Sequence, residues 1–301
     1  MTDPVLTLRD LENWSFGGTA LAVLGHPIGH SLSPAMHQAA LASLGRKGGG
    51  FGAWGYFRFD VLPEELARAL GLLHAAGFLG INLTVPHKVI AFGLVSEIDE
   101  DARAVGAVNT LLRTPGGWRG SNTDGYGLAE GLRGSLGRDL KGAAVLLLGA
   151  GGAARGAAVE CLRRKCASLQ IANRTKSHGE ALAGALRAMA GGIPVSADGL
   201  PSPRMEWPGS IVINATSSGL LPGDAAPVDL ASLPRPAAVY DMVYNPPRTR
   251  LLEQAALLGI PCANGLSMLA NQGAKSLEAW TGVPASETAA CMLAAAQAAM
   301  P

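Results

Sequence analysis

The chain has 301 residues, of which 48% are hydrophobic and 16% are charged. This length and composition indicate a folded protein, more naturally of two domains than of one, and exclude a disordered chain. The formal net charge is +1 and no run of five like charges occurs, which argues against a nucleic-acid-binding surface. The N-terminal residues have no secretory pattern and the apolar stretches are too short to cross a bilayer, so we expect a cytoplasmic protein without a membrane partner.

Apolar runs of strand length alternate with helical patterns in the first part of the chain. Strands are predicted at 19–25, 54–60, 80–85 and 106–113, and helices at 33–45 and 62–77. Ser33 is predicted to cap the first of these helices, with Pro34 at its first position.

A second alternating series begins near Thr123. It comprises a first helix, strands at 143–149, 168–173, 210–216 and 237–243, helices at 153–165 and 176–190, and two Ala-rich helices at about 266–281 and 285–299. The Gly- and Pro-rich stretches 191–209 and 218–227 are predicted loops. Two such series predict two α/β domains with mostly parallel sheets.

A glycine loop joins a predicted strand to a predicted helix in the second series. The stretch "LLLGAGGAARGAA" places Gly149, Gly151 and Ala154 in the spacing GxGxxA. Glycines there allow a tight turn and a close approach of the backbone to a pyrophosphate, which the helix N-terminus attracts. In this context the motif predicts a dinucleotide site more strongly than a structural turn.

The residue after the next predicted strand indicates which dinucleotide is bound. Sites for NAD usually carry an acidic residue there, whereas this chain has Arg174. A guanidinium group suits a 2′-phosphate, so NADP is predicted over NAD. An exposed loop arginine without a ligand is the alternative, and its place relative to the glycine loop favours the functional interpretation.

Four polar stretches, 25–34, 82–88, 106–110 and 121–127, are each placed at the end of a predicted strand. Ligands of open α/β sheets bind outside the carboxyl ends of the strands. The side chains are therefore expected to converge on one small, polyhydroxylated carboxylic acid. They are Ser31, Ser33, Asn82, Thr84, Lys88, Asn109 and Asp124. The six histidines and four cysteines include no HExxH or CxxC motif, so no metal is expected.

Together these motifs resemble the shikimate dehydrogenase family. The polar stretches, with "GAGGA", "ANRT", "NATSSG", "YDMVYNPPRTRLL" and "NGLSMLANQGAKSLEAW", cover nearly the whole chain in the family's order. The resemblance implies an α/β substrate domain, residues 1–123 and 265–301, and a Rossmann-type NADP-binding domain, residues 124–264. The C-terminal helices would return to the first domain.

The implied activity is the reversible NADPH-dependent reduction of 3-dehydroshikimate to shikimate, in the biosynthesis of chorismate and aromatic amino acids. The resemblance makes Lys88 and Asp124 the catalytic pair and permits a monomer or a homodimer. The implied substrate-binding residues are Ser31, Ser33, Asn82, Thr84, Lys88, Asn109, Asp124, Tyr244 and Gln272. The implied NADP-binding residues are Gly149, Ala150, Gly151, Gly152, Ala153, Asn173, Arg174, Thr175, His178, Thr216, Met242 and Gly265.

Lys88 suits a reaction in which charge develops on a ketone oxygen, because a lysine beside a carboxylate can give or take the proton. Which of Lys88 and Asp124 is the formal base is left open. The alternative, a surface lysine, is weakened because a helix N-terminus disfavours a cation. Asp124 could also cap its helix.

Two residues depart from the family pattern. Gln38 follows His37 where an asparagine is usual, and His178 stands where NADP-using members often carry a second arginine. A quinate/shikimate dehydrogenase of broader range stays an alternative. A catalytically silent ligand sensor is a further one, which the retention of Lys88 and Asp124 disfavours.

Overall fold

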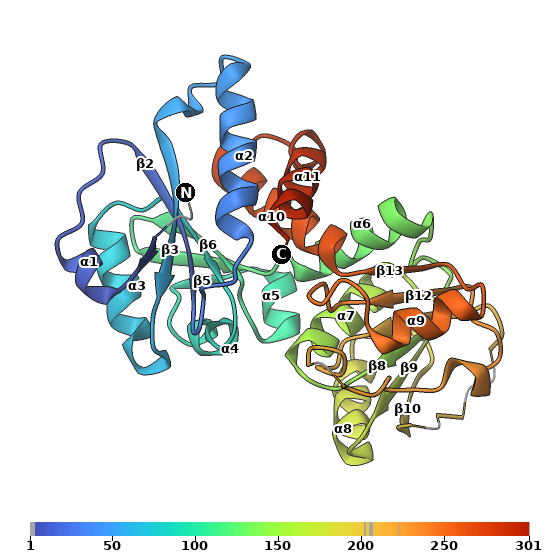
Figure 1. The fold of residues 1–301 in the computed structure, drawn as a ribbon. Coiled ribbons are helices and arrows are strands. Elements are labelled where there is room, and N and C mark those ends of the chain that lie inside the picture. The colour runs from blue at the N-terminus through green and yellow to red at the C-terminus, as the bar shows by residue number, and fades with distance from the viewer. Residues whose placement is uncertain (1–3, 202, 205–206, 222, 301) are drawn as a thin grey trace. The chain divides into compact units, whose positions relative to one another are not determined.

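A computed structural model describes residues 4–201, 203–204, 207–221 and 223–300. The chain divides into two compact units, one of residues 1–123 with 270–301 and one of residues 124–269 (Figure 1). Both units consist of a sheet with helices, which is the predicted α/β class. Among the described helices, none combines the length and the apolar character that crossing a membrane would require.

The first unit is a sheet between two helix layers. Its strands are β1 (Val5–Leu6), β2 (Thr19–Gly25), β3 (Trp54–Asp60), β4 (Gly80–Leu83), β5 (Glu97–Ile98), β6 (Thr110–Thr114) and β7 (Gly117–Ser121). Its helices are α1 (Leu8–Glu12), α2 (Ser33–Arg46), α3 (Leu66–Ala75), α4 (His87–Phe92), α5 (Glu100–Val105), most of α10 (Leu266–Thr281) and α11 (Ala289–Ala299).

The strands of this sheet lie in the order β1-β3-β2-β4-β6-β7-β5. The pairings are parallel except for those of β6, which runs antiparallel to both β4 and β7. Helices α1 and α3 cover one face, where Leu11, Phe59 and Leu70 belong to one apolar core. Helices α2, α10 and α11 lie on the other side of the sheet (Figure 1), and Trp280 of α10 donates a hydrogen bond to the Leu111 carbonyl of β6. The predicted return of the C-terminal helices to this unit is confirmed.

Two local predictions for this unit were wrong. Helix α2 begins at Ser33 itself and Leu32 occupies the N-cap, so Ser33 does not cap the helix. The stretch 106–110 precedes β6 instead of following a strand. Because β6 is antiparallel to β4, with Thr110 opposite Asn82, the start of β6 lies at the edge where β4 ends. The stretch therefore reaches the expected edge by a different strand direction.

The second unit is a parallel sheet with helices. Its strands are β8 (Ala144–Leu148), β9 (Ser168–Asn173), β10 (Val195–Gly199), β11 (Ile211–Asn214), β12 (Ala238–Asp241) and β13 (Cys262–Asn264). Its helices are α6 (Asp124–Leu136), α7 (Gly152–Arg163), α8 (Lys176–Arg187) and α9 (Arg250–Leu257). The described strands lie in the order β10-β9-β8-β11-β12-β13, all parallel. This is the order of a Rossmann sheet, whose switch point lies between β8 and β11.

The sequence analysis missed three elements of this unit. Strand β10 lies inside the predicted loop 191–209, where it pairs with β9 along its whole length. Its sequence VSADG is short and polar, so tertiary pairing decided its conformation. Residues 202, 205, 206 and 222 of the two predicted loops lie outside the described residues. Helix α9 and strand β13 had no prediction, and α9 contributes Leu251, Leu252 and Ala255 to the apolar core.

A buried histidine lies on the inner face of α2 in the first unit. The ring of His37 is fully buried and stacks on Tyr56, with ring centroids 4.1 Å apart and planes 3° from parallel. Neither ring nitrogen has a hydrogen-bond partner among the described residues. Burial therefore lowers the pKa of His37 from 6.5 to about 3, and the folded protein holds this ring neutral.

This burial predicts a loss of stability in mild acid. Above pH 6.5 the His37 ring is neutral in both the folded and the unfolded chain, so its protonation does not change the free energy of unfolding. Between pH 6.5 and about 3 the unfolded chain binds a proton that the folded chain excludes. The free energy of unfolding should fall by about 1.4 kcal/mol per pH unit, or about 2 kcal/mol at pH 5. His37→Phe should remove this contribution in urea unfolding at pH 7 and pH 5, whereas His178→Gln, at an exposed site, should not. If the free energy of unfolding fell equally between pH 7 and pH 5 in His37→Phe and in the wild type, the prediction would be wrong.

Candidate functional site

The first unit holds a network of buried polar side chains where β4 ends. Asn82, which is 5% exposed, uses both ends of its amide group. Its Nδ2 donates to Ser276 Oγ at 2.9 Å, to the Asn109 carbonyl at 3.2 Å and to Thr110 Oγ1 at 3.3 Å. Its Oδ1 accepts a 2.8 Å hydrogen bond from the Tyr56 hydroxyl. Residues from β3, β4, β6 and α10 are thereby joined around one amide.

Asn109 extends this network to the end of β7 and to α10. Its Oδ1 accepts from the Thr123 backbone N–H and from Thr110 Oγ1, both at 2.9 Å. Its Nδ2 donates to Thr123 Oγ1 at 3.0 Å and to Gln272 Oε1 at 3.3 Å. The structure therefore brings together three of the predicted substrate-binding residues, Asn82, Asn109 and Gln272, in one unit. The sequence analysis did not single out Tyr56, Thr110, Thr123 and Ser276 as site residues. Thr110, Thr123 and Ser276 lie inside stretches that it did name, and this position was the signal that could have identified them.

Two of the predicted substrate-binding residues, both serines, lie at the start of α2. Ser31 is half-buried, and its Oγ accepts a 3.3 Å hydrogen bond from the Ser33 backbone N–H. Ser33 is 8% exposed. Arg58 donates a 2.7 Å hydrogen bond to the Gly29 carbonyl and so holds the loop that precedes both serines.

Thr84 and Lys88 lie where β4 leads into α4, a segment that backbone hydrogen bonds hold in place. Thr84 is half-buried, and its carbonyl accepts a 2.8 Å hydrogen bond from the His87 N–H. His87 is buried and its ring bonds the Val61 carbonyl through Nε2 at 2.9 Å. Lys88 is half-buried at the second position of α4, and its carbonyl accepts from the Val108 N–H at 2.9 Å. This places the lysine at the polar edge of the sheet, next to the start of β6.

The glycine loop of the second unit has the form that a dinucleotide requires. Gly149 has φ +113°, and a Cβ there would lie 3.0 Å from the Ala215 carbonyl oxygen. Gly151 is the N-cap of α7 and provides no side-chain cap. A Cβ at Gly151 or Gly152 would meet no atom within 4 Å, so open space lies beside the first turn of α7. Uncapped N–H groups beside open space fit a pyrophosphate.

The connection from β9 to α8 carries exposed cationic and polar residues. Asn173 Nδ2 donates to the Thr175 carbonyl at 2.8 Å, which fixes the turn. Arg174, Thr175 and His178 are exposed, and Lys176 lies 4.0 Å from Asp198. This is the position in a Rossmann sheet where the adenosine ribose is recognised, and its cationic character fits a 2′-phosphate.

A buried carboxylate holds the ends of β11 and β12. Asp241 is fully buried and accepts from Asn214 Nδ2 at 2.9 Å and from Thr249 Oγ1 at 2.6 Å. Burial raises the pKa of Asp241. Asn214 Oδ1 in turn accepts from the N–H and hydroxyl of Thr216 at 3.0 and 2.7 Å, and its backbone carbonyl accepts from the Met242 N–H. The predicted cofactor residues Thr216 and Met242 are therefore oriented by Asn214 and Asp241. The sequence analysis did not single out Asp241. The signal that could have identified it is an acidic residue within a predicted apolar strand, at the point where the strand ends in the structure.

Gly265 passes close to the backbone after β12. A Cβ at Gly265 would lie 2.1 Å from the Met242 carbonyl oxygen, so only glycine fits this approach.

Tyr244 is half-buried, and burial raises the pKa of its phenol. Asp124 is half-buried at the first position of α6. Within the described residues, His, Cys, Asp and Glu side chains form no group of three that could hold a metal ion.

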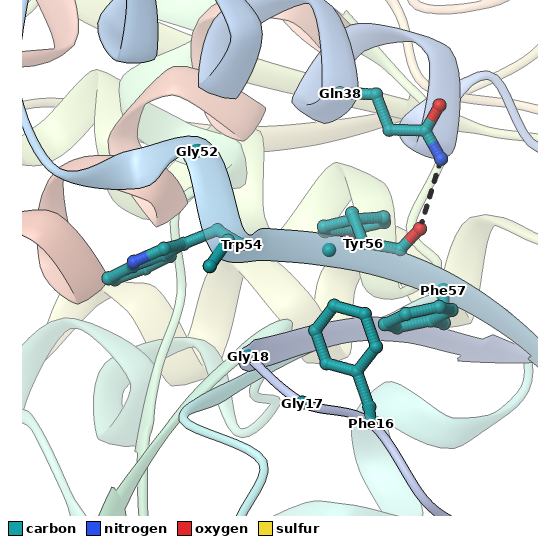
Figure 2. Close-up of a pocket in the computed structure, with 10 residues that line it drawn as sticks. Phe16, Gly17, Gly18, Gln38, Gly52, Trp54, Tyr56 and Phe57 are labelled. Carbon is teal, nitrogen blue, oxygen red and sulfur yellow. Dashed lines mark hydrogen bonds between the residues drawn. The ribbon is translucent and has the colours of Figure 1, made fainter.

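A depression of about 510 Å³ lies elsewhere on the first unit. Figure 2 shows its lining by Phe16, Gln38, Trp54 and Phe57, around the start of β3. Tyr56 lines the depression and also belongs to the buried network, the rest of which lies toward the opposite, carboxyl ends of the parallel strands. The mainly apolar lining of the depression offers no group for acid–base chemistry, so we do not place the active site there.

Known protein families match most of the chain. Residues 23–111 match the shikimate dehydrogenase substrate binding domain, residues 132–201 match shikimate/quinate 5-dehydrogenase, and residues 265–297 match the shikimate 5′-dehydrogenase C-terminal domain. An NADP(+)-dependent shikimate dehydrogenase of Citrifermentans bemidjiense is 42% identical over an alignment of 273 residues, and the alignment covers 88% of this chain and 91% of that protein.

Two solved structures resemble the whole chain. Shikimate 5-dehydrogenase of Thermus thermophilus, in complex with NADP(H) and shikimate, has a TM-score of 0.81 and 36% identity, covering 94% of this chain and 100% of that one. The ligand-free 5-ketofructose reductase of Gluconobacter sp. strain CHM43 has a TM-score of 0.83 and 32% identity, covering 95% and 100%.

The close approach at Gly265 predicts a specific loss of dinucleotide binding. In Gly265→Ala the new Cβ must displace the Met242 carbonyl, and with it the loop after β12. The dissociation constant for NADP, measured by calorimetry, should rise by about tenfold or more. Gly134→Ala is the matched control, because a Cβ on this exposed helical position meets no neighbouring atom. Unchanged NADP affinity in Gly265→Ala would remove this segment from the site.

Proposed function

Because this chain belongs to the shikimate dehydrogenase family, we propose that it catalyses the reversible NADPH-dependent reduction of 3-dehydroshikimate to shikimate. The observation that carries this proposal is similarity over nearly the whole length to NADP-dependent shikimate dehydrogenases. The polar network of the first unit and the glycine loop of the second supply the two kinds of site that the reaction needs.

We assign the substrate to the polar edge of the first unit. Ser31 and Ser33 carry hydroxyls at the start of α2, where the helix N-terminus also favours a carboxylate. Thr84, Asn109 and Gln272 offer hydroxyl and amide groups for the ring hydroxyls. Asn82 and Tyr244 belong to the proposed set as well, although the Asn82 amide is already bonded at both ends to protein groups. Its contribution is then partly to orient its neighbours.

We assign the cofactor to the carboxyl edge of the second sheet. Gly149 to Ala153 would hold the pyrophosphate, and Asn173 to His178 the adenosine ribose, with Arg174 on the 2′-phosphate. Thr216, Met242 and Gly265 would line the remainder of the site. NADPH, when bound, supplies the hydride for the reduction.

The proposed work of Lys88 is to move a proton at the reacting oxygen. In the reduction, negative charge develops on the ketone oxygen and Lys88 donates a proton to it. In the oxidation, the hydroxyl proton returns to Lys88 or to Asp124. Asp124 is proposed as its partner in this proton transfer. Interactions that strengthen only as charge develops raise turnover more than they raise substrate affinity.

The functional division of the chain follows the same proposal. Residues 1–123 and 265–301 are assigned to the substrate domain, and residues 124–264 to the NADP domain. The compact units instead divide within α10, after Leu269. A cytoplasmic location, and a monomeric or homodimeric state, stay predictions.

A steady-state assay of the purified protein tests the proposed function and the role of Arg174 together. Shikimate and quinate are each offered with NADP and with NAD, and 5-ketofructose is offered with NADPH because a reductase of that sugar has a similar fold. We expect the highest kcat/KM for shikimate with NADP. Arg174→Asp should lower kcat/KM with NADP by about tenfold or more, since it removes one charge-assisted hydrogen bond and adds repulsion. Arg204→Asp, outside the proposed site, is the control.

Different results of this assay would change the conclusion. Comparable rates with quinate would indicate a quinate/shikimate dehydrogenase. Binding of shikimate without turnover would indicate a ligand sensor, and a preference for 5-ketofructose would refute the proposed substrate. An unchanged NADP/NAD ratio in Arg174→Asp would show that this arginine does not select the cofactor.

Lys88→Ala should abolish most turnover while it leaves substrate binding nearly intact. A general acid–base group contributes about 10²–10⁴-fold to kcat, so kcat should fall within that range and the KM for shikimate should change little. Lys47→Ala, at an exposed lysine beyond α2, is the control. A kcat close to that of the wild type would rule out Lys88 as the proton donor.

A further inference from the structure

Tyr56 has no assigned role toward the substrate so far, yet it is held from several directions. It is 1% exposed in the middle of β3. His37 stacks on its ring at 4.1 Å, and Gln38 Nε2 donates to its backbone carbonyl at 3.3 Å (Figure 2 shows the Gln38 contact). Both residues come from α2, the helix that begins at Ser33. Gln38, which departs from the family pattern, therefore contacts the same residue that His37 covers.

The hydroxyl of Tyr56 contacts a proposed substrate-binding residue. It donates to Asn82 Oδ1 at 2.8 Å. Burial raises the pKa of this phenol well above its ordinary value, so the group stays protonated and remains a donor. Tyr56 thus connects α2, through its ring and its backbone carbonyl, to the end of β4 through its hydroxyl.

We propose that Tyr56 is a positioning residue for substrate binding, which fixes the Asn82 amide through its hydroxyl while His37 and Gln38 of α2 hold Tyr56 in place. This inference rests on the proposed function, in which Asn82 belongs to the ring-hydroxyl end of the site. The hydroxyl of Tyr56 then sets the orientation of the amide at that end.

The orientation of the Asn82 amide depends on this contact. With Oδ1 held by Tyr56, Nδ2 must face Ser276, Thr110 and the Asn109 carbonyl. Without the phenolic hydroxyl, Oδ1 is a buried acceptor with one partner fewer, and the amide gains a reason to rotate. This rotation would act on the bound substrate and would not touch the proton transfer.

Tyr56→Phe isolates this role, because it removes one oxygen atom and keeps the ring that stacks on His37. We expect the KM for shikimate to rise about tenfold, as for the loss of a buried hydrogen bond. The kcat should stay within about threefold of the wild type and the KM for NADP should not change. Tyr240→Phe is the matched control: Tyr240 is equally buried, and its hydroxyl bonds Ser267 and the Met268 N–H in the second unit.

A second variant and a double substitution test whether Tyr56 acts through Asn82. Ser276→Ala removes the acceptor on the opposite side of the Asn82 amide and should raise the KM for shikimate in the same selective way. This variant also carries the test if Tyr56→Phe does not fold. In an Asn82→Ala background, the further change Tyr56→Phe should raise the KM for shikimate by less than about twofold. The effects of residues that act through one contact are not additive.

The outcomes separate this inference from the proposed function. A wild type that does not turn over shikimate refutes the proposed function. An active wild type, with an unchanged KM for shikimate in Tyr56→Phe or Ser276→Ala, refutes the role of Tyr56. An equal rise in the KM for shikimate and for NADP also refutes it, because it would show a general loss of structure.

Discussion

The antiparallel pairing of β6 with β4 is the constraint on which the polar edge of the first unit depends. In a wholly parallel sheet, the stretch before β6 would lie at the amino edge, away from the ends of β2 and β4. The reversal places Thr110 opposite Asn82 and Ser121 opposite Thr110, so Asn109 and Thr123 meet at the same edge. Four polar segments separated in the chain are thereby concentrated in one place.

That concentration is stable because nearly every polar group in it has a partner. Burying an amide without hydrogen bonds costs about 1–3 kcal/mol, so a half-satisfied network would destabilise the unit. Asn82 and Asn109 avoid this cost by bonding to Ser276 and Gln272 of α10 as well as to the sheet. Helix α10 is therefore part of the polar site and also part of the fold of this unit.

The second unit uses a buried charge for a similar purpose. Asp241 gathers hydrogen bonds from Asn214 and Thr249, and these orient the segments after β11 and β12. Close backbone approaches bring Gly149 of the glycine loop next to Ala215, after β11, and Gly265 next to Met242, after β12, where a larger residue would not fit. A hydrogen-bonded carboxylate and two glycines thus shape this edge of the sheet.

The sequence by itself determined the elements whose signal is local. Strands β2, β3 and β9 and helix α10 agree with the predicted ranges, because apolar periodicity and flanking turn residues are properties of neighbours in the chain. The glycine loop and Arg174 were singled out from the same kind of local signal, and the role of Arg174 stays a prediction. Strand β10 was missed because its pairing partner β9, and not its own residues VSADG, makes it a strand.

Only the tertiary structure decided which polar residues share a network. Tyr56, Thr110, Thr123 and Ser276 are ordinary residues in the sequence, and their roles come from contacts that span up to 194 positions of the chain. The direction of β6, the burial of His37 and the closeness of Gly265 to Met242 likewise depend on long-range packing. Hydrogen-bond partners are fixed by three-dimensional proximity, and a linear pattern of residue types does not contain it.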